Sequence, residues 1–258
     1  MKIKLLEDYP YLYETHMHTN LGSACGQNTG AQMAAACKAF GYTGAFVTDH
    51  NWGGNTCVSR ELPWQEWMTR YSRGYADAKA YGDANDLDVF FGMETGFDGT
   101  EFLILGLDVQ WFIDNPDIRI ADIKKQYELV HGAGGLVSQA HPYRVEPYIP
   151  EIRIFPEYAD AIEAFNAMHS SPLSTRQNDP AWNDSAVELA LASGKIMTAG
   201  SDAHSTDLVA GGMAFKRRFR SASELCSALL SGEDYIMSDG GSWRDRQGRM
   251  IAPVEFIK

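Results

Sequence analysis

Short apolar runs alternate along the chain with longer segments in which apolar residues recur at helical spacing. The runs are rich in β-branched and aromatic residues and end at polar residues or glycine, which is typical of buried strands. They lie at 12–15, 44–48, 89–93, 102–108, 135–139, 161–166 and 195–200. Roughly seven strands alternating with helices predict an α/β fold.

The segments between the runs carry ordinary helix signals. Thr29 can cap a helix over 31–40 that ends at Gly41, where a left-handed backbone is tolerated. Pro63 suits the first turn of one long helix over 62–82, whose aromatic residues at helical spacing we expect to be core packing. Further helices are predicted at 121–135, 185–194 and 221–230.

Side chains that can bind metal follow the ends of five of these strands. They are His16 and His18 in HMH, His50 in TDH, Glu94 in MET, His141 in AHP, and Asp202 with His204 in SDAH. The carboxyl ends of parallel strands in a barrel converge on one face, so residues remote in sequence can meet there. The pattern therefore predicts a shared metal site.

Some of these residues also fit ordinary structural roles that involve no metal. HxH places two imidazoles on one strand face, but by itself is also compatible with two surface histidines. Glu94 follows an apolar strand, where a carboxylate is costly unless it is paired or coordinated, and a helix-capping acid is the alternative. Asp49, beside His50, is predicted as a catalytic residue that orients the imidazole, although a turn aspartate fits as well.

Length and composition fit one ordinary globular domain. The chain has 258 residues, 45% of them hydrophobic and 22% charged, and single α/β barrels of about 200–250 residues are common. We expect one barrel domain over 1–258, with the metal motifs within 14–204 and a closing helix and C-terminal tail over 205–258.

Net charge and cysteine content indicate which classes of binding partner and which cellular compartment to expect. The formal net charge of −12 disfavours a nucleic-acid polymer or an anionic membrane and favours a bound metal. The basic run KRRFR at 216–220 is expected in a solvated edge strand or loop. Four cysteines without CxxC spacing predict reduced thiols, and no segment has the length of a signal or membrane-spanning helix, so we expect a cytoplasmic protein.

As a set, the motifs HMH, TDH, Glu94, AHP and GSDAH resemble the PHP superfamily, named for polymerase and histidinol phosphatase domains. The resemblance implies a distorted seven-stranded, TIM-like (β/α) barrel that binds two or three divalent ions at its strand ends. It implies a first ion on His16, His18, Glu94 and Asp202, a second sharing Glu94 and taking His141, and a third on His50 and His204. Such ligands suit Zn²⁺, Mn²⁺ or Fe²⁺.

The chain departs from the family pattern at two places. Family members usually carry an Asp or His five or six residues after HxH, where this chain has Ser23 and Ala24. Cys25 is the nearest group that could bind, but we leave it outside the predicted ligands, since a thiol without a ligand role is the simpler interpretation. Leu103 stands where many members have a His. Glu101, on the same strand face, is a substitute or an exposed charge.

The resemblance implies hydrolysis of a small phosphomonoester or phosphodiester. Clustered divalent ions lower the pKa of a bound water toward neutrality and align the resulting hydroxide behind phosphorus. Arg144 is expected to bind a phosphate oxygen pair, with a surface salt bridge as the alternative. His169, three residues after Asn166, is expected to contact substrate or protonate a leaving group, or else to be an ordinary loop histidine.

Two other functions stay open. HxH and strand-end carboxylates also serve amidohydrolase-type hydrolysis of C–N bonds. A degenerate, non-catalytic metal-binding domain fits the missing family ligands at Leu103 and after HxH. The sequence indicates neither the substrate, which depends on loops such as 51–60 and 166–179, nor the oligomeric state.

Overall fold

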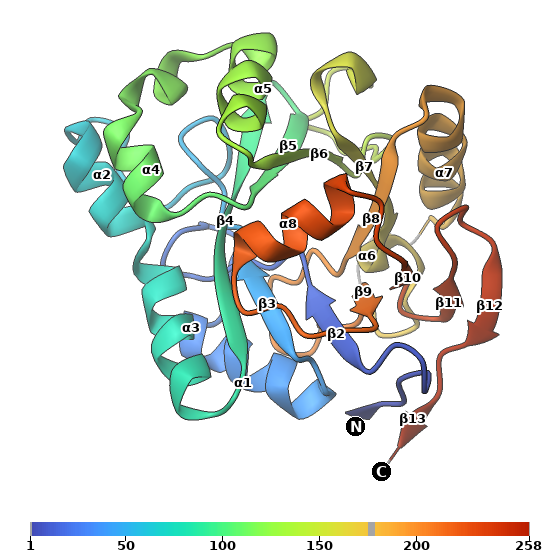
Figure 1. Cartoon of the computed structure of the whole chain (residues 1–258). Helices are drawn as coiled ribbons and strands as arrows, with labels where there is room; N and C mark the ends of the chain where they lie inside the picture. Colours follow the sequence, from blue (N-terminus) through green and yellow to red (C-terminus); the bar gives the residue numbers. More distant parts are fainter. Residues whose placement is uncertain (1, 175–178, 258) are drawn as a thin grey trace.

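The computed structural model describes residues 2–174 and 179–257. Within these residues an eleven-stranded sheet curls through the centre of the molecule, with helices around its outside (Figure 1). The strand order is β12-β11-β10-β9-β2-β3-β4-β5-β6-β7-β8. A separate pair, β1 with β13, brings the two ends of the described chain together.

The strands, in chain order, are β1 (Lys2–Ile3), β2 (Tyr11–Glu14), β3 (Gly44–Val47), β4 (Asp88–Phe97), β5 (Thr100–Leu105), β6 (Leu136–Ala140), β7 (Ala161–Asn166), β8 (Ile196–Gly200), β9 (Gly212–Phe215), β10 (Tyr235–Ser238), β11 (Ser242–Arg244), β12 (Met250–Pro253) and β13 (Phe256–Ile257). The helices are α1 (Gly30–Phe40), α2 (Trp64–Tyr71), α3 (Arg73–Ala84), α4 (Val109–Asp114), α5 (Ile123–Gly132), α6 (Ala167–Ser170), α7 (Ala181–Ser193) and α8 (Ala222–Leu230), with 3-10 turns η1 (Pro116–Ile120) and η2 (Pro156–Tyr158).

Strand direction is mixed within the sheet. β2, β3 and β4 are parallel neighbours, and so are β6, β7 and β8, whereas β5 is antiparallel to both β4 and β6. The reason lies in the connection between β4 and β5, where Asp98 and Gly99 both have positive φ, of 48° and 87°. A two-residue loop of this kind can only join antiparallel strands.

Residues beyond the regular strands bring the edge strand β8 against β2, which lies inside the strand order. Met17, after β2, forms a parallel bridge with Ala203, after β8, and the amide of His18 donates to the carbonyl of Ala203 at 2.9 Å. The contact lies at the carboxyl ends of both strands. The predicted α/β class is confirmed as a curled half-barrel of mixed strand direction, while the closed seven-stranded barrel stays a prediction.

Apolar residues fill the inside of the curl and both of its outer flanks. The inner cluster includes Tyr13, Phe46 and Leu103, and α8 covers it with Leu225 and Leu229. On the outside, α1 and α3 pack together over β3 and β4, while α2, α4 and α5 belong to another apolar cluster over the middle of the sheet. The site at the strand ends therefore rests on a packed interior.

Several predicted elements agree closely with the structure. Thr29 caps α1 through a capping box, and Gly41 ends that helix with φ 112°. The predicted helix over 62–82 is wrong in one respect, because it breaks at Ser72 into α2 and α3. The break accompanies a close approach by Gly74, where an added Cβ would lie 2.2 Å from the Thr19 hydroxyl.

Other elements were not predicted from the sequence pattern. The segment between β5 and α5 forms α4 and η1, with Asp108 capping α4 by accepting from the amide of Trp111 at 2.8 Å. Residues 205–258, expected as a closing helix and tail, contain α8 and also β9 to β13. Among the described residues, no helix has the length and apolar character needed to cross a membrane.

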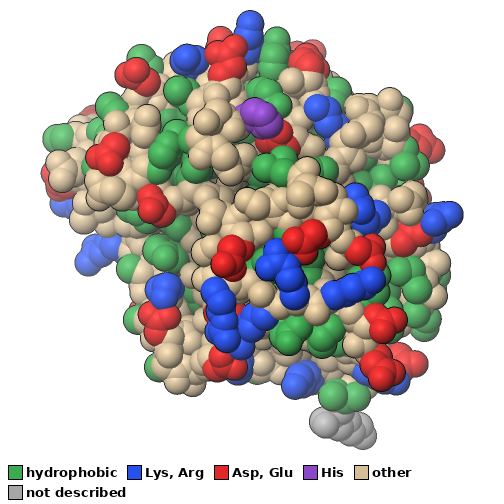
Figure 2. Space-filling view, viewed as in Figure 1, with side chains coloured by type: hydrophobic (Ala, Val, Ile, Leu, Met, Phe, Trp, Pro, Cys, Tyr) green, Lys and Arg blue, Asp and Glu red, His purple; other side chains and the backbone are tan. Residues whose placement is uncertain are grey.

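The basic run at 216–220 is used in ion pairs with neighbouring acids. Arg217 pairs with Glu233 at 2.7 Å, and Arg218 pairs with Asp88 at 2.5 Å. Figure 2 shows the same mixture, since the Lys and Arg side chains on the visible face are interspersed with acidic ones. This run lies between β9 and α8, in agreement with the predicted loop.

Replacing Leu103 by alanine should destabilise the fold. Leu103 is fully buried in the inner cluster, so Leu103→Ala should lower the free energy of unfolding by about 2–5 kcal/mol in urea denaturation. Leu191, which is 54% exposed on α7, is a matched control whose change to alanine should have an effect of about 0.5 kcal/mol or less. Equal effects of the two substitutions would contradict the assignment of Leu103 to the core.

Candidate metal centre

Two imidazoles and two carboxylates converge just past the ends of β2 and β8 and beside the second half of β4. His16 Nε2 lies 3.2 Å from Glu94 Oε1 and 3.4 Å from Asp202 Oδ1. His18 Nε2 lies 3.1 Å from the same Asp202 oxygen and 3.5 Å from Glu94 Oε2. All four side chains are buried. The structure thus brings together the four residues expected to hold a first ion.

The spacing of these four donors fits a small divalent ion. Donors 2.0–2.2 Å from a tetrahedral centre are separated from one another by about 3.3–3.6 Å. The four imidazole-to-carboxylate separations are 3.1–3.5 Å, with Glu94 facing His16 through Oε1 and His18 through Oε2. Among the described residues, His16 Nε2 and Glu94 Oε2 are buried atoms without a hydrogen bond of good geometry. Buried nitrogen and carboxylate oxygen atoms without hydrogen-bond partners, within one cluster of imidazoles and carboxylates, are what a bound ion would satisfy.

Glu94 connects this donor set to two further imidazoles. Its Oε1 lies 3.0 Å from His141 Nε2, and its Oε2 lies 2.7 Å from His50 Nδ1. The backbone of β4 supports the arrangement, since His50 and Glu94 form a parallel bridge. A carboxylate with different imidazoles at each oxygen can bridge two adjacent ions.

Glu101 lies in the centre and is not an exposed strand start. It is 7% exposed, and its carboxylate approaches His50 Nδ1 at 3.6 Å and His141 Nε2 at 3.7 Å. Leu103, two residues later, packs into the core. The carboxylate of Glu101 therefore lies where a substitute for the family's histidine would be needed, two residues before Leu103 on the same strand.

Sequence reasoning missed Glu163, which lies behind the donors. Its Oε1 contacts His16 Nδ1 at 2.8 Å, while its Oε2 accepts from the amide of His141 at 3.0 Å and from Asn166 Nδ2 at 3.1 Å. A carboxylate on Nδ1 fixes the tautomer that leaves Nε2 free for a metal. The available signal was a charged residue within the buried strand β7, where an acid is costly unless paired.

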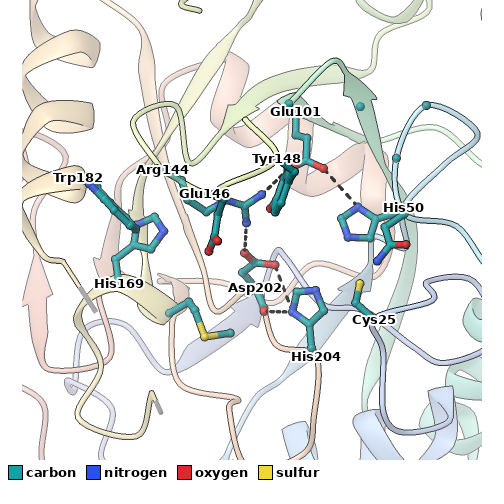
Figure 3. Close-up of a pocket in the computed structure, with 16 residues that line it drawn as sticks. Cys25, His50, Glu101, Arg144, Glu146, Tyr148, His169, Trp182, Asp202 and His204 are labelled. Atoms are coloured by element: carbon teal, nitrogen blue, oxygen red, sulfur yellow. Dashed lines mark hydrogen bonds and ion pairs between the residues drawn. The ribbon is translucent and has the colours of Figure 1, made fainter. Parts of the chain in front are cut away.

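A second group of donors lies on the other side of His18. Ligand atoms of His18, His50 and His204 lie within 4.8 Å of one another, and the His18 ring stacks between the other two with centroids 4.5 and 4.4 Å away. Cys25 contacts His50 and His204 (Figure 3). Burial alone would raise the pKa of the Cys25 thiol, but hydrogen bonds with His204 and His50 hold it at about 6.

The structure places Asp49 behind the centre, outside the cavity. Its Oδ1 accepts from the Thr19 amide at 2.6 Å and the Ser23 hydroxyl at 2.7 Å, and its Oδ2 accepts from the Thr19 hydroxyl at 2.7 Å. Ser23 in turn accepts from the amide of His50 at 2.9 Å. The carboxylate of Asp49 therefore fixes the loop after β2 and acts on His50 only through Ser23.

Arg144 and His169 both line a cavity of about 510 Å³ at the centre (Figure 3). Arg144 pairs with Glu101 at 2.5 Å and with Asp202 at 3.2 Å. His169 contacts Asn183 through Nδ1 at 3.1 Å, and Trp182 meets its ring edge to face. Burial, together with the nearby His141 and Arg144, lowers the pKa of His169 to about 4, so the ring is neutral.

The cavity wall combines charged and apolar side chains. Cys25, His50, Glu101, Asp202 and His204 line one part of it, and Tyr148, Met168 and Trp182 line another. Both loops named by the sequence contribute, through Gly53 and Gly54 in one and Met168 and His169 in the other. Within the second loop, residues 175–178 lie outside the described residues. The size suits a small ligand.

The side chains of the metal centre carry a net negative charge. Four buried carboxylates, Glu94, Glu101, Glu163 and Asp202, meet one guanidinium, that of Arg144, leaving three negative charges when the imidazoles are neutral. Burial lowers the pKa of His16, but Glu163, Asp202 and Glu94 outweigh this and hold it well above its usual range. A charge of this size in a buried site requires added protons or cations.

Two of the donor residues have a strained backbone. Apart from glycine, positive φ occurs at four described residues, and two of these are His141 at 27° and Asp202 at 54°. Such conformations cost about 1–3 kcal/mol each and persist where the surroundings enforce them. Here they turn the chain sharply at the ends of β6 and β8, so that the side chains face the centre.

Comparison with known proteins finds one family model and several solved structures of similar fold. A family model described as PHP-associated matches residues 180–233, a stretch that contains Asp202 and His204. No curated protein matches the sequence significantly. A solved structure from Bacteroides vulgatus, a two-domain protein containing a predicted PHP-like metal-dependent phosphoesterase, has a TM-score of 0.67 at 14% identity, covering 94% of this chain and 69% of that one.

Two other solved structures have a TM-score of 0.50 with this chain at 15% identity. One is a candidate metal-dependent phosphoesterase from Bifidobacterium adolescentis, with 76% of this chain and 88% of that chain covered. The other is an amidohydrolase from Chromobacterium violaceum with bound sulfate and no metal, with 74% and 87% covered. At these identities the likeness concerns the fold alone.

Removing the charge of Glu163 should weaken metal binding. Glu163→Gln keeps the shape but loses the carboxylate that holds His16 Nδ1, and loss of such outer partners typically lowers metal affinity 10–100-fold. Competition titration with a fluorescent chelator would measure this for Zn²⁺. Glu128→Gln, at a side chain 50% exposed on α5, should leave the affinity unchanged, and equal affinities of the two variants would contradict the role of Glu163.

Proposed function

We propose that the chain is a metal-dependent phosphoesterase that hydrolyses a small phosphomonoester or phosphodiester. Its resemblance to the PHP superfamily is supported by the PHP-associated family model, which matches residues 180–233, and the shared fold agrees with it. Two similar structures carry a phosphoesterase description, and one of them is PHP-like. The bond that is cleaved would be a phosphoester bond, and the reaction would take place beside the donors at the strand ends.

One observation carries the proposal. The buried donors His16, His18, Glu94 and Asp202 meet at 3.1–3.5 Å in a pocket with excess negative charge. Neutral imidazoles with carboxylates form the ligand type that suits Zn²⁺, Mn²⁺ or Fe²⁺. The proposed count is two or three divalent ions, with Glu94 shared between the first and the second.

Each side chain would have a defined task in the reaction. His16, His18, Glu94 and Asp202 hold the first ion, and His141 with Glu101 extends the site past Glu94 Oε1. When bound, clustered divalent ions lower the pKa of water and stabilise the oxygens of an in-line displacement at phosphorus. Glu163 keeps His16 oriented, and Asp49 keeps the loop at 19–23 in place, a positioning role instead of the predicted catalytic one.

Arg144 and His169 are proposed to contact the substrate. Arg144 lines the cavity, and its Nε is a buried donor without a hydrogen bond among the described residues. A guanidinium beside an ion site can bind a phosphate oxygen pair. His169 also has an unpartnered Nε2. Its Nδ1 faces the acceptor oxygen Oδ1 of Asn183, so Nδ1 carries the proton of the neutral ring and Nε2 can accept a hydrogen bond from substrate. Bound sulfate in the Chromobacterium violaceum structure shows that a similar fold holds a tetrahedral anion.

Hydrolysis of a C–N bond is the second candidate. The structure from Chromobacterium violaceum is an amidohydrolase, and a metal-bound imidazole and carboxylate site serves that chemistry too. The arginine on the cavity wall favours a phosphorylated substrate. The balance between the two candidates therefore depends on Arg144.

Loss of a central ligand should abolish phosphoester hydrolysis. Purified protein loaded with Mn²⁺ or Zn²⁺ should hydrolyse p-nitrophenyl phosphate or its bis-ester, and a chelator should stop the reaction. His16→Ala and Asp202→Ala should each lower kcat/KM more than about 100-fold, because even outer partners of a metal cost 10–100-fold. His131→Ala, at a half-exposed histidine paired with Asp160, is the matched control and should retain activity.

Three outcomes of that assay would contradict the proposal. Turnover of amides or cyclic ureas without turnover of phosphoesters would favour the C–N hydrolase. Tight metal binding without activity on a broad phosphoester panel would favour a non-catalytic domain. Equal loss in His131→Ala and His16→Ala would show that the assay reports stability and not the metal centre.

A further inference from the structure

We propose that Cys25 is a metal ligand, which with His50 and His204 forms a thiolate-containing site for an additional ion beside the four-donor set. The inference rests on the proposed metal centre and adds the identity of its third ion. A thiolate ligand makes this ion thiophilic, Zn²⁺ in preference to Mg²⁺ or Mn²⁺. Binding would release the thiol proton to solvent and leave the sulfur as the anionic donor.

The position of Cys25 carries the proposal. Its thiol is within hydrogen-bonding contact of both His50 and His204, and all three residues line the cavity. In Figure 3, Cys25 lies beside His50 and His204 on the same side of Asp202. The two imidazoles belong to a buried group whose ligand atoms lie within 4.8 Å of one another. A thiol and two imidazoles together are a common zinc-binding combination.

The imidazoles have ring nitrogens to offer this site. His204 Nδ1 lies 2.8 Å from the carbonyl oxygen of Asp202, so Nδ1 carries the proton and Nε2 keeps a lone pair. His50 Nδ1 lies 2.7 Å from Glu94 Oε2, so Nε2 is the nitrogen that this ring can offer to the site. His18 stacks between the two rings, but its Nε2 lies 3.1 Å from Asp202 Oδ1, within the first donor set.

The turn that carries Cys25 is fixed by close backbone packing. An added Cβ on Gly22 would lie 2.4 Å from Asp49 Oδ2, and one on Gly26 would lie 2.4 Å from the backbone of Thr19. On either side of Cys25, the Ala24 amide donates to Asn55 at 2.8 Å and the Gln27 amide donates to His204 at 2.8 Å. The turn that carries Cys25 is therefore hydrogen-bonded to the backbone of His204.

This placement also accounts for the departure after HxH. The resemblance implied a ligand at Ser23 or Ala24, yet Ser23 is used in hydrogen bonds to Asp49 and His50. Cys25, one or two residues later, is the residue of this turn that reaches the cavity. Three protein ligands would leave one position of a tetrahedral ion open for water or substrate, as in catalytic zinc sites.

Cobalt substitution tests the sulfur ligand directly. The full chain loaded with Co²⁺ should show an intense near-ultraviolet sulfur-to-cobalt charge-transfer band, and Cys25→Ser should lose the band and about one ion per chain. Cys25→Asp should lack the band but recover the ion, because a carboxylate restores an anionic ligand. Cys57→Ser, at an exposed cysteine, should keep both.

X-ray absorption spectroscopy of the unaltered chain tests for the sulfur ligand without a variant. Zinc-loaded protein should show a Zn–S shell at about 2.3 Å, and a zinc spectrum containing only N and O ligands would overturn the proposal. Retention of the cobalt band in folded Cys25→Ser would overturn it as well. Metal-dependent phosphoester hydrolysis without any sulfur ligand would refute the Cys25 site alone, whereas a sulfur ligand in a protein inactive on phosphoesters would refute the proposed function alone.

Discussion

A single buried carboxylate, that of Glu94, links the parts of this centre. It is fully buried and lies within 3.5 Å of four imidazoles, those of His16, His18, His50 and His141. An unpaired carboxylate in such surroundings would be strongly destabilising. Since Glu101, Glu163 and Asp202 add further negative charge, the arrangement is explained best by cations that satisfy several carboxylates together.

The backbone makes this convergence possible. One donor, Glu94, lies within β4, and the others follow the ends of β2, β3, β6 and β8. The bridges His50 to Glu94 and Met17 to Ala203 extend the pairing past the regular strands. Gly200 allows the final approach, because an added Cβ would lie 2.5 Å from the Cβ of His16. The contacts that bring β2 against β8 also bring the donors together. Metal binding and folding are therefore coupled.

Periodicity and residue type were enough to predict most strand ends and the seven side chains that the structure brings close together, because apolar runs followed by His, Glu or Asp are local signals. The strand end predicted before Glu94 was wrong, since β4 continues to Phe97. The long-range pairings were not predictable. Nothing local shows that Glu163 reaches His16, that Arg144 lies between Glu101 and Asp202, or that Asp49 bonds to Thr19 and Ser23. The break at Ser72 was also missed, and it lies beside a long-range approach of Gly74 to Thr19 that no local signal shows.

The central claim is that the strand-end donors form a metal site, and anomalous diffraction from crystals grown with Zn²⁺ or Mn²⁺ tests it most directly. The account predicts an anomalous peak about 2.0–2.2 Å from the Nε2 atoms of His16 and His18, with a second ion about 3.5–4 Å away across Glu94. Crystals in which all metal lies on surface carboxylates, with the four donors unchanged and without a peak among them, would contradict it.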